Sequence, residues 1–153
     1  MPEMPKAGDK APAIEANTYG EESVSLGDFK GKKAVVLYFY PRDNTPGCTK
    51  EACGMRDSME TLSEMGVQVM GVSTDSVKSH ENFRDKYELN FPLLSDKERE
   101  IVRAYGVENE RGSAKRVTFL IDKNGVVKHV WPKVKVDGHV DDVLSKIKEL
   151  GVA

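Results

Sequence analysis

The feature that most constrains the fold is an uninterrupted run of apolar and β-branched residues, AVVLYFY, at Ala34–Tyr40. A half-buried strand alternates apolar with polar residues, whereas a continuous apolar run is typical of a strand covered on both faces. Val67–Ser73 and Val117–Asp122 are two further runs of this kind. The sequence therefore predicts a central sheet flanked by helices.

Turn signals predict how some of these strands pair. Val117–Asp122 is followed by Lys123-Asn124-Gly125 and then by another β-rich segment, Val126–Trp131. Asn-Gly between two such segments is a strong hairpin signal, so these two strands should pair antiparallel. A second hairpin is expected over Ile14–Leu26. The polar, proline-bearing residues 1–13 before it should form an arm that lies on the surface.

The segments between the strands carry apolar residues at helical spacing. Helices are predicted over Cys48–Met65, Val77–Leu89, Glu98–Tyr105 and Val140–Leu150. The order β-α-β-α-α-β-β-α gives right-handed crossovers between parallel strands, followed by an antiparallel hairpin. This predicts an α/β chain of thioredoxin-like architecture, with a mixed central sheet flanked by helices and an N-terminal β-hairpin extension. The 153 residues have the length of one domain, so we expect residues 1–153 to form a single domain.

Composition excludes several classes of function. Lys plus Arg number 23 and Asp plus Glu 25, and a formal charge of −2 offers no basic surface for nucleic acid or an anionic membrane. No apolar run approaches the ~20 residues of a membrane span, and the N-terminus lacks the apolar core of a secretory signal. The two cysteines and three histidines show no metal-ligand spacing. We therefore expect a cytoplasmic protein that binds no nucleic acid, membrane or metal.

The candidate chemistry lies in the loop and helix that follow the first buried strand. Ligands in open α/β sheets bind outside the carboxyl ends of the strands. Thr45 is a good N-cap and Pro46 a good first helical residue, so Cys48 should lie in the first helical turn. Cysteines at helix N-termini face free backbone N–H groups and are often reactive. The alternative is a buried, inert cysteine.

Cys53 lies five residues after Cys48. In an intact helix the two Cα atoms would be roughly 8.7 Å apart, beyond the limit of about 7 Å for a disulfide. A bond between the two cysteines would therefore require the helix to unwind, which would make the pair a redox element with two states. The alternative is that Cys53 is only a core residue of this helix.

The segment around the two cysteines resembles the active-site segment of the peroxiredoxins. The resemblance is closest to the subfamily called bacterioferritin comigratory protein, or peroxiredoxin Q. Its pattern P-x-x-x-T-x-x-C is complete at Pro41, Thr45 and Cys48. Several separated motifs in the same order are more specific than any single one. The others are Gly8–Pro12, Gly31-Lys32, Phe91–Asp96 and Arg116–Asp122.

The resemblance implies a thiol-dependent peroxidase that reduces hydrogen peroxide and organic hydroperoxides without a cofactor. Cys48 would be the peroxidatic cysteine, which becomes a sulfenic acid, and Cys53 would resolve it as an intramolecular disulfide. The Thr45 hydroxyl would contact the sulfur and the peroxide, and Pro41 would shield the sulfur from water. Arg116 would stabilise the thiolate and polarise the O–O bond.

Several alternatives stay open. Arg116 is otherwise a surface arginine at the start of a strand, and Glu51 either orients an arginine or lies on the helix surface. The resemblance implies thioredoxin or another dithiol protein as the reductant, and it favours a monomer. A thiol–disulfide oxidoreductase is a different function of the same fold, disfavoured because four residues rather than two separate the cysteines. A non-enzymatic binding module with structural cysteines is a third possibility.

Overall fold

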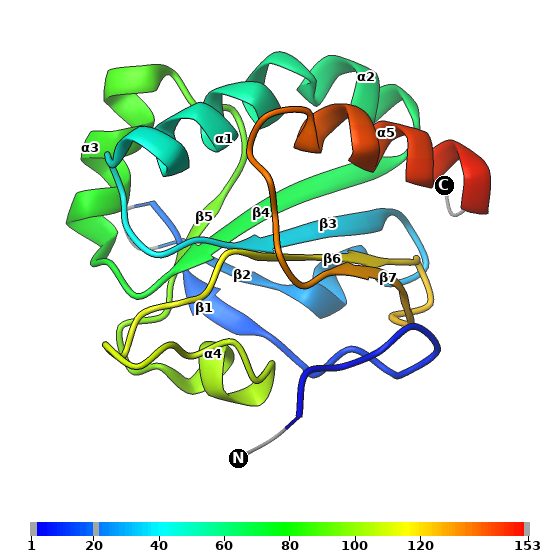
Figure 1. The fold of residues 1–153 in the computed structure, drawn as a ribbon, viewed down its shortest axis with the longest axis horizontal. Coiled ribbons are helices and arrows are strands. Elements are labelled where there is room, and N and C mark those ends of the chain that lie inside the picture. Colours follow the sequence, from blue (N-terminus) through cyan, green and yellow to red (C-terminus); the bar gives the residue numbers. More distant parts are fainter. Residues whose placement is uncertain (1–2, 20–21, 152–153) are drawn as a thin grey trace.

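The computed structural model describes residues 3–19 and 22–151, which form a seven-stranded mixed sheet flanked by helices (Figure 1). The strands are β1 Glu15–Asn17, β2 Ser23–Ser25, β3 Ala34–Phe39, β4 Val67–Ser73, β5 Leu93–Ser95, β6 Val117–Ile121 and β7 Val127–Trp131. The helices are α1 Pro46–Asp57, α2 Met59–Glu64, α3 Val77–Tyr87, α4 Glu100–Ala104 and α5 His139–Leu150, with the 3-10 helix η1 at Leu26–Phe29. The predicted mixed α/β architecture is confirmed.

The sheet has the order β2-β1-β5-β4-β3-β6-β7. β3 and β4 pair in parallel, as do β4 and β5, whereas β6 pairs antiparallel with both β3 and β7. The predicted Asn-Gly hairpin joins β6 to β7, and the predicted N-terminal hairpin is formed by β1 and β2. Residues 20 and 21, between β1 and β2, lie outside the described residues.

β3 is buried along its whole length, as its apolar run predicts. Its side chains alternate between two cores. Val35, Leu37 and Phe39 belong to the core that includes α4 and η1, whereas Val36 and Tyr38 belong to the core beneath the other helices. Figure 1 shows α1, α2 and α5 on one side of the sheet and α4 on the other. A loop leads from the buried end of β3 at Phe39 to the start of α1 at Pro46 (Figure 1).

The predicted helix over Cys48–Met65 is in fact two helices, α1 and α2. They meet at Ser58, whose backbone leaves the helical region at φ −101° and ψ 1°. The Ser58 N–H donates to the carbonyl of Met55, a tighter turn than that of an α-helix. The apolar stripe continues across this break, so apolar spacing alone could not reveal it.

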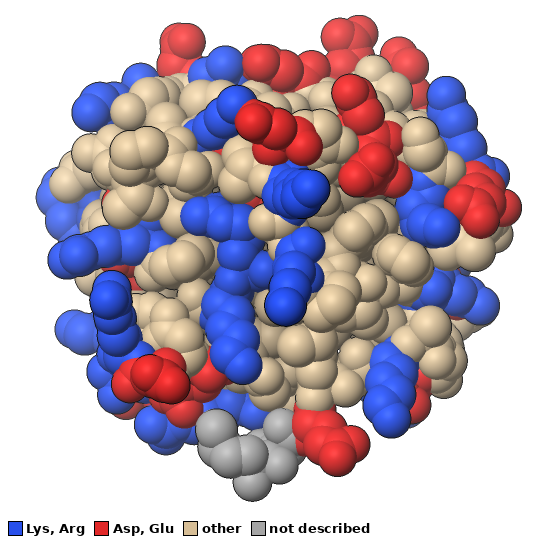
Figure 2. Space-filling view, viewed as in Figure 1, with Lys and Arg blue, Asp and Glu red and all other residues tan. Residues whose placement is uncertain are grey.

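The surface carries charges of both signs. Figure 2 shows acidic side chains mainly along the top of this face and basic side chains across its middle. No helix of the described residues combines the length and the apolar character needed to cross a bilayer.

Candidate active site

Cys48 lies in the first turn of α1, just beyond the end of β3, and is only 1% exposed. Thr45 occupies the N-cap position with an extended backbone, and Pro46 is the first helical residue, as the sequence predicts. Cys48 is therefore the third residue of the helix. The backbone N–H groups of this turn have no partner within the helix, so the sulfur lies beside the positive end of the helix dipole.

Arg116, the residue before β6, connects Cys48 to a buried carboxylate. Its Nη2 donates to Cys48 Sγ at 3.2 Å, and its Nη1 donates to Glu51 Oε1 at 2.8 Å. Gly47 lies against this guanidinium, since a Cβ at that position would be 3.1 Å from Arg116 Nη2. Arg116 is thus not a surface arginine but the cation of the site around Cys48.

Glu51 follows Cys48 by three residues on α1 and is 2% exposed, so it does not lie on the helix surface. Burial raises the pKa of Glu51 to about 7, against the opposing effects of the charge and hydrogen bond of Arg116. For Arg116, burial lowers the pKa, but the neighbouring Glu51 and Cys48 more than offset it, so the pKa of Arg116 is raised. The guanidinium therefore remains charged between the two groups.

Thr45 and Pro41 lie in the loop that leads to Cys48. The Thr45 hydroxyl donates to the carbonyl of Arg42 at 3.1 Å and does not cap the backbone of α1. Thr45 thus holds the N-cap position without the side-chain hydrogen bond that usually accompanies it. Pro41 is half-buried at the end of the strand segment.

Cys53 is half-buried in the middle of α1, and both cysteines are free. The helix is continuous across them. Cys53 lines a cavity of about 420 Å³ between α1 and the start of α5. The two helices approach closely at Gly54, where a Cβ would be 3.0 Å from Val140 Cγ2. Any bond between the cysteines would thus have to unwind α1 beside α5.

A buried network that the sequence analysis did not anticipate anchors the loop before Cys48. Asp43 accepts hydrogen bonds from the Tyr40 hydroxyl at 2.7 Å and the Ser79 hydroxyl at 2.8 Å. His80 is fully buried, with Nδ1 2.7 Å from the Asp43 carboxylate and Nε2 3.1 Å from the carbonyl of Leu94. Both ring nitrogens of His80 therefore lie within hydrogen-bond distance of an oxygen, and the Asp43 carboxylate holds one of them.

Asp43, Asp75 and His80 also have the ligand types of a metal site, with atoms within 4.8 Å of one another. Hydrogen bonds within the protein already occupy the polar atoms of these three side chains. Asp75 Oδ2 accepts from the Asp43 N–H at 2.8 Å and from the Ser73 hydroxyl at 2.7 Å. Because buried polar groups are normally satisfied in this way, we interpret the cluster as an anchor for the loop.

Replacing Asp43 with asparagine puts an NH2 group, which cannot accept a hydrogen bond, in place of a carboxylate oxygen that contacts Ser79 and His80. Leaving a buried donor without its acceptor costs about 1–3 kcal/mol, and several donors share this carboxylate, so we expect Asp43→Asn to lower the free energy of unfolding by about 3 kcal/mol. Asp57→Asn is the matched control, because its ion pair with Arg56 is exposed and should contribute less than about 1 kcal/mol. Urea unfolding measures both variants. Equal losses would contradict the anchoring role.

His139 is the first residue of α5, and its side chain is buried. Its Nε2 is hydrogen-bonded to the Thr118 hydroxyl at 2.9 Å. Burial, assisted by the positive charge of Arg116 and opposed by Asp142, lowers the pKa of His139 to about 4. His139 is therefore neutral at neutral pH.

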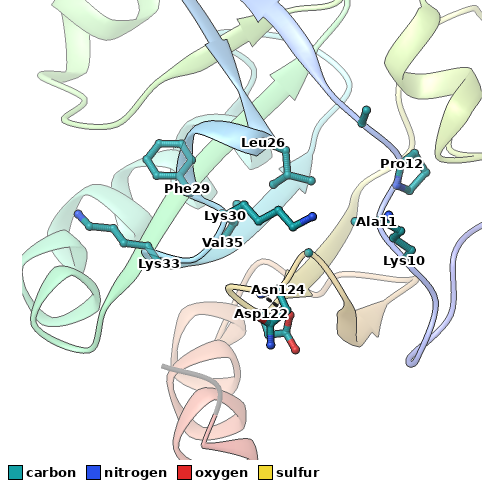
Figure 3. A pocket seen from close by; sticks show the side chains of 13 residues that line it. Lys10, Ala11, Pro12, Leu26, Phe29, Lys30, Lys33, Val35, Asp122 and Asn124 are labelled. Carbon is teal, nitrogen blue, oxygen red and sulfur yellow. Dashed lines mark hydrogen bonds between the residues drawn. The ribbon is translucent and has the colours of Figure 1, made fainter.

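A separate cavity of about 410 Å³ lies near the start of β3, away from Cys48. Figure 3 shows the residues that line it. Leu26, Phe29 and Val35 contribute apolar surface to it, and Lys10 and Lys30 also line it. Val35 lies near the start of β3, whereas Cys48 follows the end of that strand. This cavity is not part of the site around Cys48.

Comparison with known proteins places the chain in a family. The sequence matches the AhpC/TSA family over residues 7–130, which is most of the chain. The chain therefore belongs to the AhpC/TSA family.

Comparison with individual relatives assigns the chain to one group within this family. A protein named putative peroxiredoxin bcp from Coxiella burnetii is 53% identical over 149 residues, covering 93% of this chain and 98% of the relative. A mutant of PrxQ from Xylella fastidiosa superimposes with a TM-score of 0.90 at 33% identity, covering 96% and 98% of the two chains. A bacterioferritin comigratory protein from Xanthomonas campestris with alkyl peroxide reduction activity matches with a TM-score of 0.82 at 36% identity, covering 89% of each chain. The chain is thus a peroxiredoxin of the Bcp/PrxQ group, a thiol peroxidase of thioredoxin-like fold, which confirms the predicted family, fold and enzyme class.

Proposed function

We propose that Cys48 is the peroxidatic cysteine of this thiol peroxidase. The observation that carries the proposal is the 3.2 Å hydrogen bond from Arg116 Nη2 to Cys48 Sγ at the N-terminal turn of α1. A cationic donor and a helix N-terminus both favour the thiolate, which is the nucleophilic form of cysteine. The substrates we propose are hydrogen peroxide and organic hydroperoxides. The alkyl peroxide reduction activity of the Xanthomonas relative supports the second class.

The chemistry of the first step follows from these groups. The thiolate attacks one peroxide oxygen, a S–O bond forms, and the O–O bond breaks. The departing oxygen carries the electron pair and takes a proton, leaving Cys48 as a sulfenic acid. Arg116 is placed to stabilise the charge that develops on the departing oxygen. In this proposal the Thr45 hydroxyl turns from Arg42 to the peroxide, and Pro41 limits access of water to the sulfur.

We further propose that Cys53 resolves the sulfenic acid. Its thiol attacks the sulfur of Cys48, a disulfide forms, and water leaves. A dithiol protein such as thioredoxin then reduces the disulfide by thiol–disulfide exchange. Both cysteines and Arg116 belong to the same chain, which supports a monomer as the working unit. Because α1 is continuous from Pro46 to Asp57, the disulfide can form only if the helix unwinds.

Peroxide consumption with dithiothreitol as the electron donor tests the function. We expect continuous turnover by the wild-type protein with hydrogen peroxide and with an alkyl hydroperoxide. A thiol–disulfide oxidoreductase would instead reduce a protein disulfide such as that of insulin without consuming peroxide. A binding module would do neither. Either of these last two results would contradict the proposal.

Hydrogen exchange tests the unwinding of α1. After one equivalent of peroxide, we expect the backbone amides of residues 46–56 to exchange faster than in the reduced protein, because the disulfide removes helical hydrogen bonds. Cys53→Ser is the matched control, since it can form the sulfenic acid on Cys48 but no intramolecular bond. Its amides should keep their slow exchange, and its Cys48 should over-oxidise at high peroxide. Slow exchange in both oxidised proteins would contradict the mechanism.

A further inference from the structure

The cavity near the start of β3 is enclosed by three parts of the chain that the fold ties together. Its walls come from residues 10–13, from η1 with the residues after it, and from the turn between β6 and β7. The Ala11 N–H donates to the carbonyl of Gly125 at 2.8 Å, and the Gly31 N–H donates to the carbonyl of Lys123 at 2.6 Å. The turn between β6 and β7 therefore holds both other walls in place.

Part of the lining is apolar. Ala11, Leu26 and Val35 are buried and belong to one hydrophobic core, against which Phe29 packs. Sites for small molecules typically have volumes of about 300–1,000 Å³, mostly apolar walls and a few polar groups. The volume here is about 410 Å³. Because a cavity of about 150 Å³ holds benzene, this one can hold a ligand of roughly a dozen heavy atoms.

Three lysines add positive charge to this lining. Lys10 and Lys30 are exposed and Lys33 is half-buried. None of the three forms an ion pair with a residue in the described part of the chain. Figure 3 shows Lys30 extending toward the N-terminal segment at Ala11, whereas Lys33 points away. The Lys30 ammonium therefore lies beside the apolar lining.

The single carboxylate in the lining, Asp122, is already engaged by other groups. Its Oδ1 accepts hydrogen bonds from the N–H groups of Asn124 at 2.9 Å and Val126 at 3.0 Å, and its Oδ2 lies 3.6 Å from Nζ of Lys128. Lysines therefore outnumber acids around the cavity, although the formal charge of the chain is −2. This excess of positive charge fits an anionic ligand.

The backbone of the lining favours an acyl chain over a peptide. The N–H groups of Ala11, Leu26, Lys33 and Gly125 already donate to carbonyls within the chain. A peptide that adds a strand needs free backbone groups on its partner. An acyl chain has no polar groups along its length, so it leaves none unsatisfied when it is buried.

We propose that this cavity binds the anion of a medium-chain fatty acid, with the acyl chain against the apolar lining and the carboxylate beside Lys30. Burial of the chain favours binding, by roughly fourfold in affinity for each methylene group. The lysines favour a negative headgroup over a neutral one. The site is separate from the peroxide chemistry, since Val35 lies near the start of β3 and Cys48 follows its end.

Isothermal titration calorimetry of the reduced full chain tests the proposal. Decanoate, with about a dozen heavy atoms, should bind saturably at one site per chain. Octanoate has two methylene groups fewer and should bind about tenfold more weakly. Octanol lacks the charge and should bind about fivefold more weakly than octanoate, a typical effect for one exposed ion pair. Absence of saturable decanoate binding, or equal affinities for octanol and octanoate, would overturn the proposal.

A lysine variant tests where the headgroup lies. Lys30→Gln should weaken octanoate binding about fivefold and leave octanol binding unchanged, because only the carboxylate contacts the ammonium. Lys32→Gln is the matched control, since Lys32 is exposed two residues away and does not line the cavity. It should leave both affinities unchanged. Equal effects of the two variants on octanoate, or an equal loss of octanol and octanoate affinity in Lys30→Gln, would contradict the assignment.

Arg116 is a second cation at which a carboxylate could bind, so the position of the ligand needs its own measurement. Decanoate should shift the amide resonances of residues 10–13 and 122–125 and leave those of residues 46–51 unchanged. Arg116→Ala should keep the wild-type affinity for decanoate. Shifts confined to residues 46–51, or loss of decanoate binding in Arg116→Ala, would overturn the proposal. No peroxide enters these measurements, so their outcome does not depend on the proposed function.

Discussion

Cys48→Ser is expected to abolish catalytic peroxide reduction while preserving the fold. A serine hydroxyl is not ionised at neutral pH, so the variant lacks the nucleophile even with Arg116 in place. The replacement is almost isosteric, and the guanidinium that donates to Sγ can donate to the serine oxygen. Peroxide consumption with dithiothreitol measures the loss, and circular dichroism with thermal unfolding checks the fold.

Cys53→Ser is the matched control for this experiment, because it removes a thiol from the same helix and keeps Cys48. It should still consume one equivalent of peroxide rapidly, since the first step needs only Cys48. Continuous turnover by Cys48→Ser would show that another group attacks the peroxide. Loss of the first equivalent in Cys53→Ser would also contradict the assignment.

Arg116→Ala is expected to slow the reaction with peroxide by about 10²–10³-fold, which is typical when a donor to a developing oxyanion is removed. The variant also leaves Glu51 buried without its cation. Because Arg116 opposes the effect of burial, the pKa of Glu51 should rise further above about 7, leaving a neutral carboxyl beside Cys48. Stopped-flow measurement of the second-order rate constant tests this prediction.

Two controls distinguish charge from geometry at this position. Arg116→Lys keeps a positive charge but cannot bond to both Cys48 and Glu51 with a planar fork, so its rate should fall between those of wild type and Arg116→Ala. Arg103→Ala removes an exposed arginine that pairs with Glu108 and should leave the rate unchanged. A wild-type rate in Arg116→Ala would show that the guanidinium has no part in the reaction.

The fold could be predicted well where its signals are local. The bounds of β4 match the predicted segment, and β3 and β6 differ from theirs only at the last residue. Long apolar runs and an Asn-Gly turn act over a few residues, so they can be read directly. β5 was not predicted, because a strand of three residues gives no pattern and exists through its pairing with β4 and β1.

In the candidate site, too, the local features could be predicted, whereas the side-chain contacts could not. Thr45 and Pro46 begin α1 as their local preferences predict, and this places Cys48 in the first turn. The prediction that the Thr45 side chain caps α1 was wrong, because its hydroxyl donates to the carbonyl of Arg42 and makes no capping hydrogen bond. Whether this hydroxyl accepts from a helix N–H or donates to a carbonyl depends on the path of the loop, which N-cap preference does not specify.

The sequence by itself determined the helical position of Cys48, its five-residue spacing from Cys53 and the motifs of the peroxiredoxin family, because all of these are properties of neighbouring residues. Only the tertiary structure decided what surrounds the thiol. Arg116 is 68 residues from Cys48 and reaches it because β6 pairs antiparallel with β3 in one register. The same packing buries Glu51. Such contacts depend on strand register and on how a helix lies on the sheet, and a shift of one residue in register would turn each side chain to the opposite face.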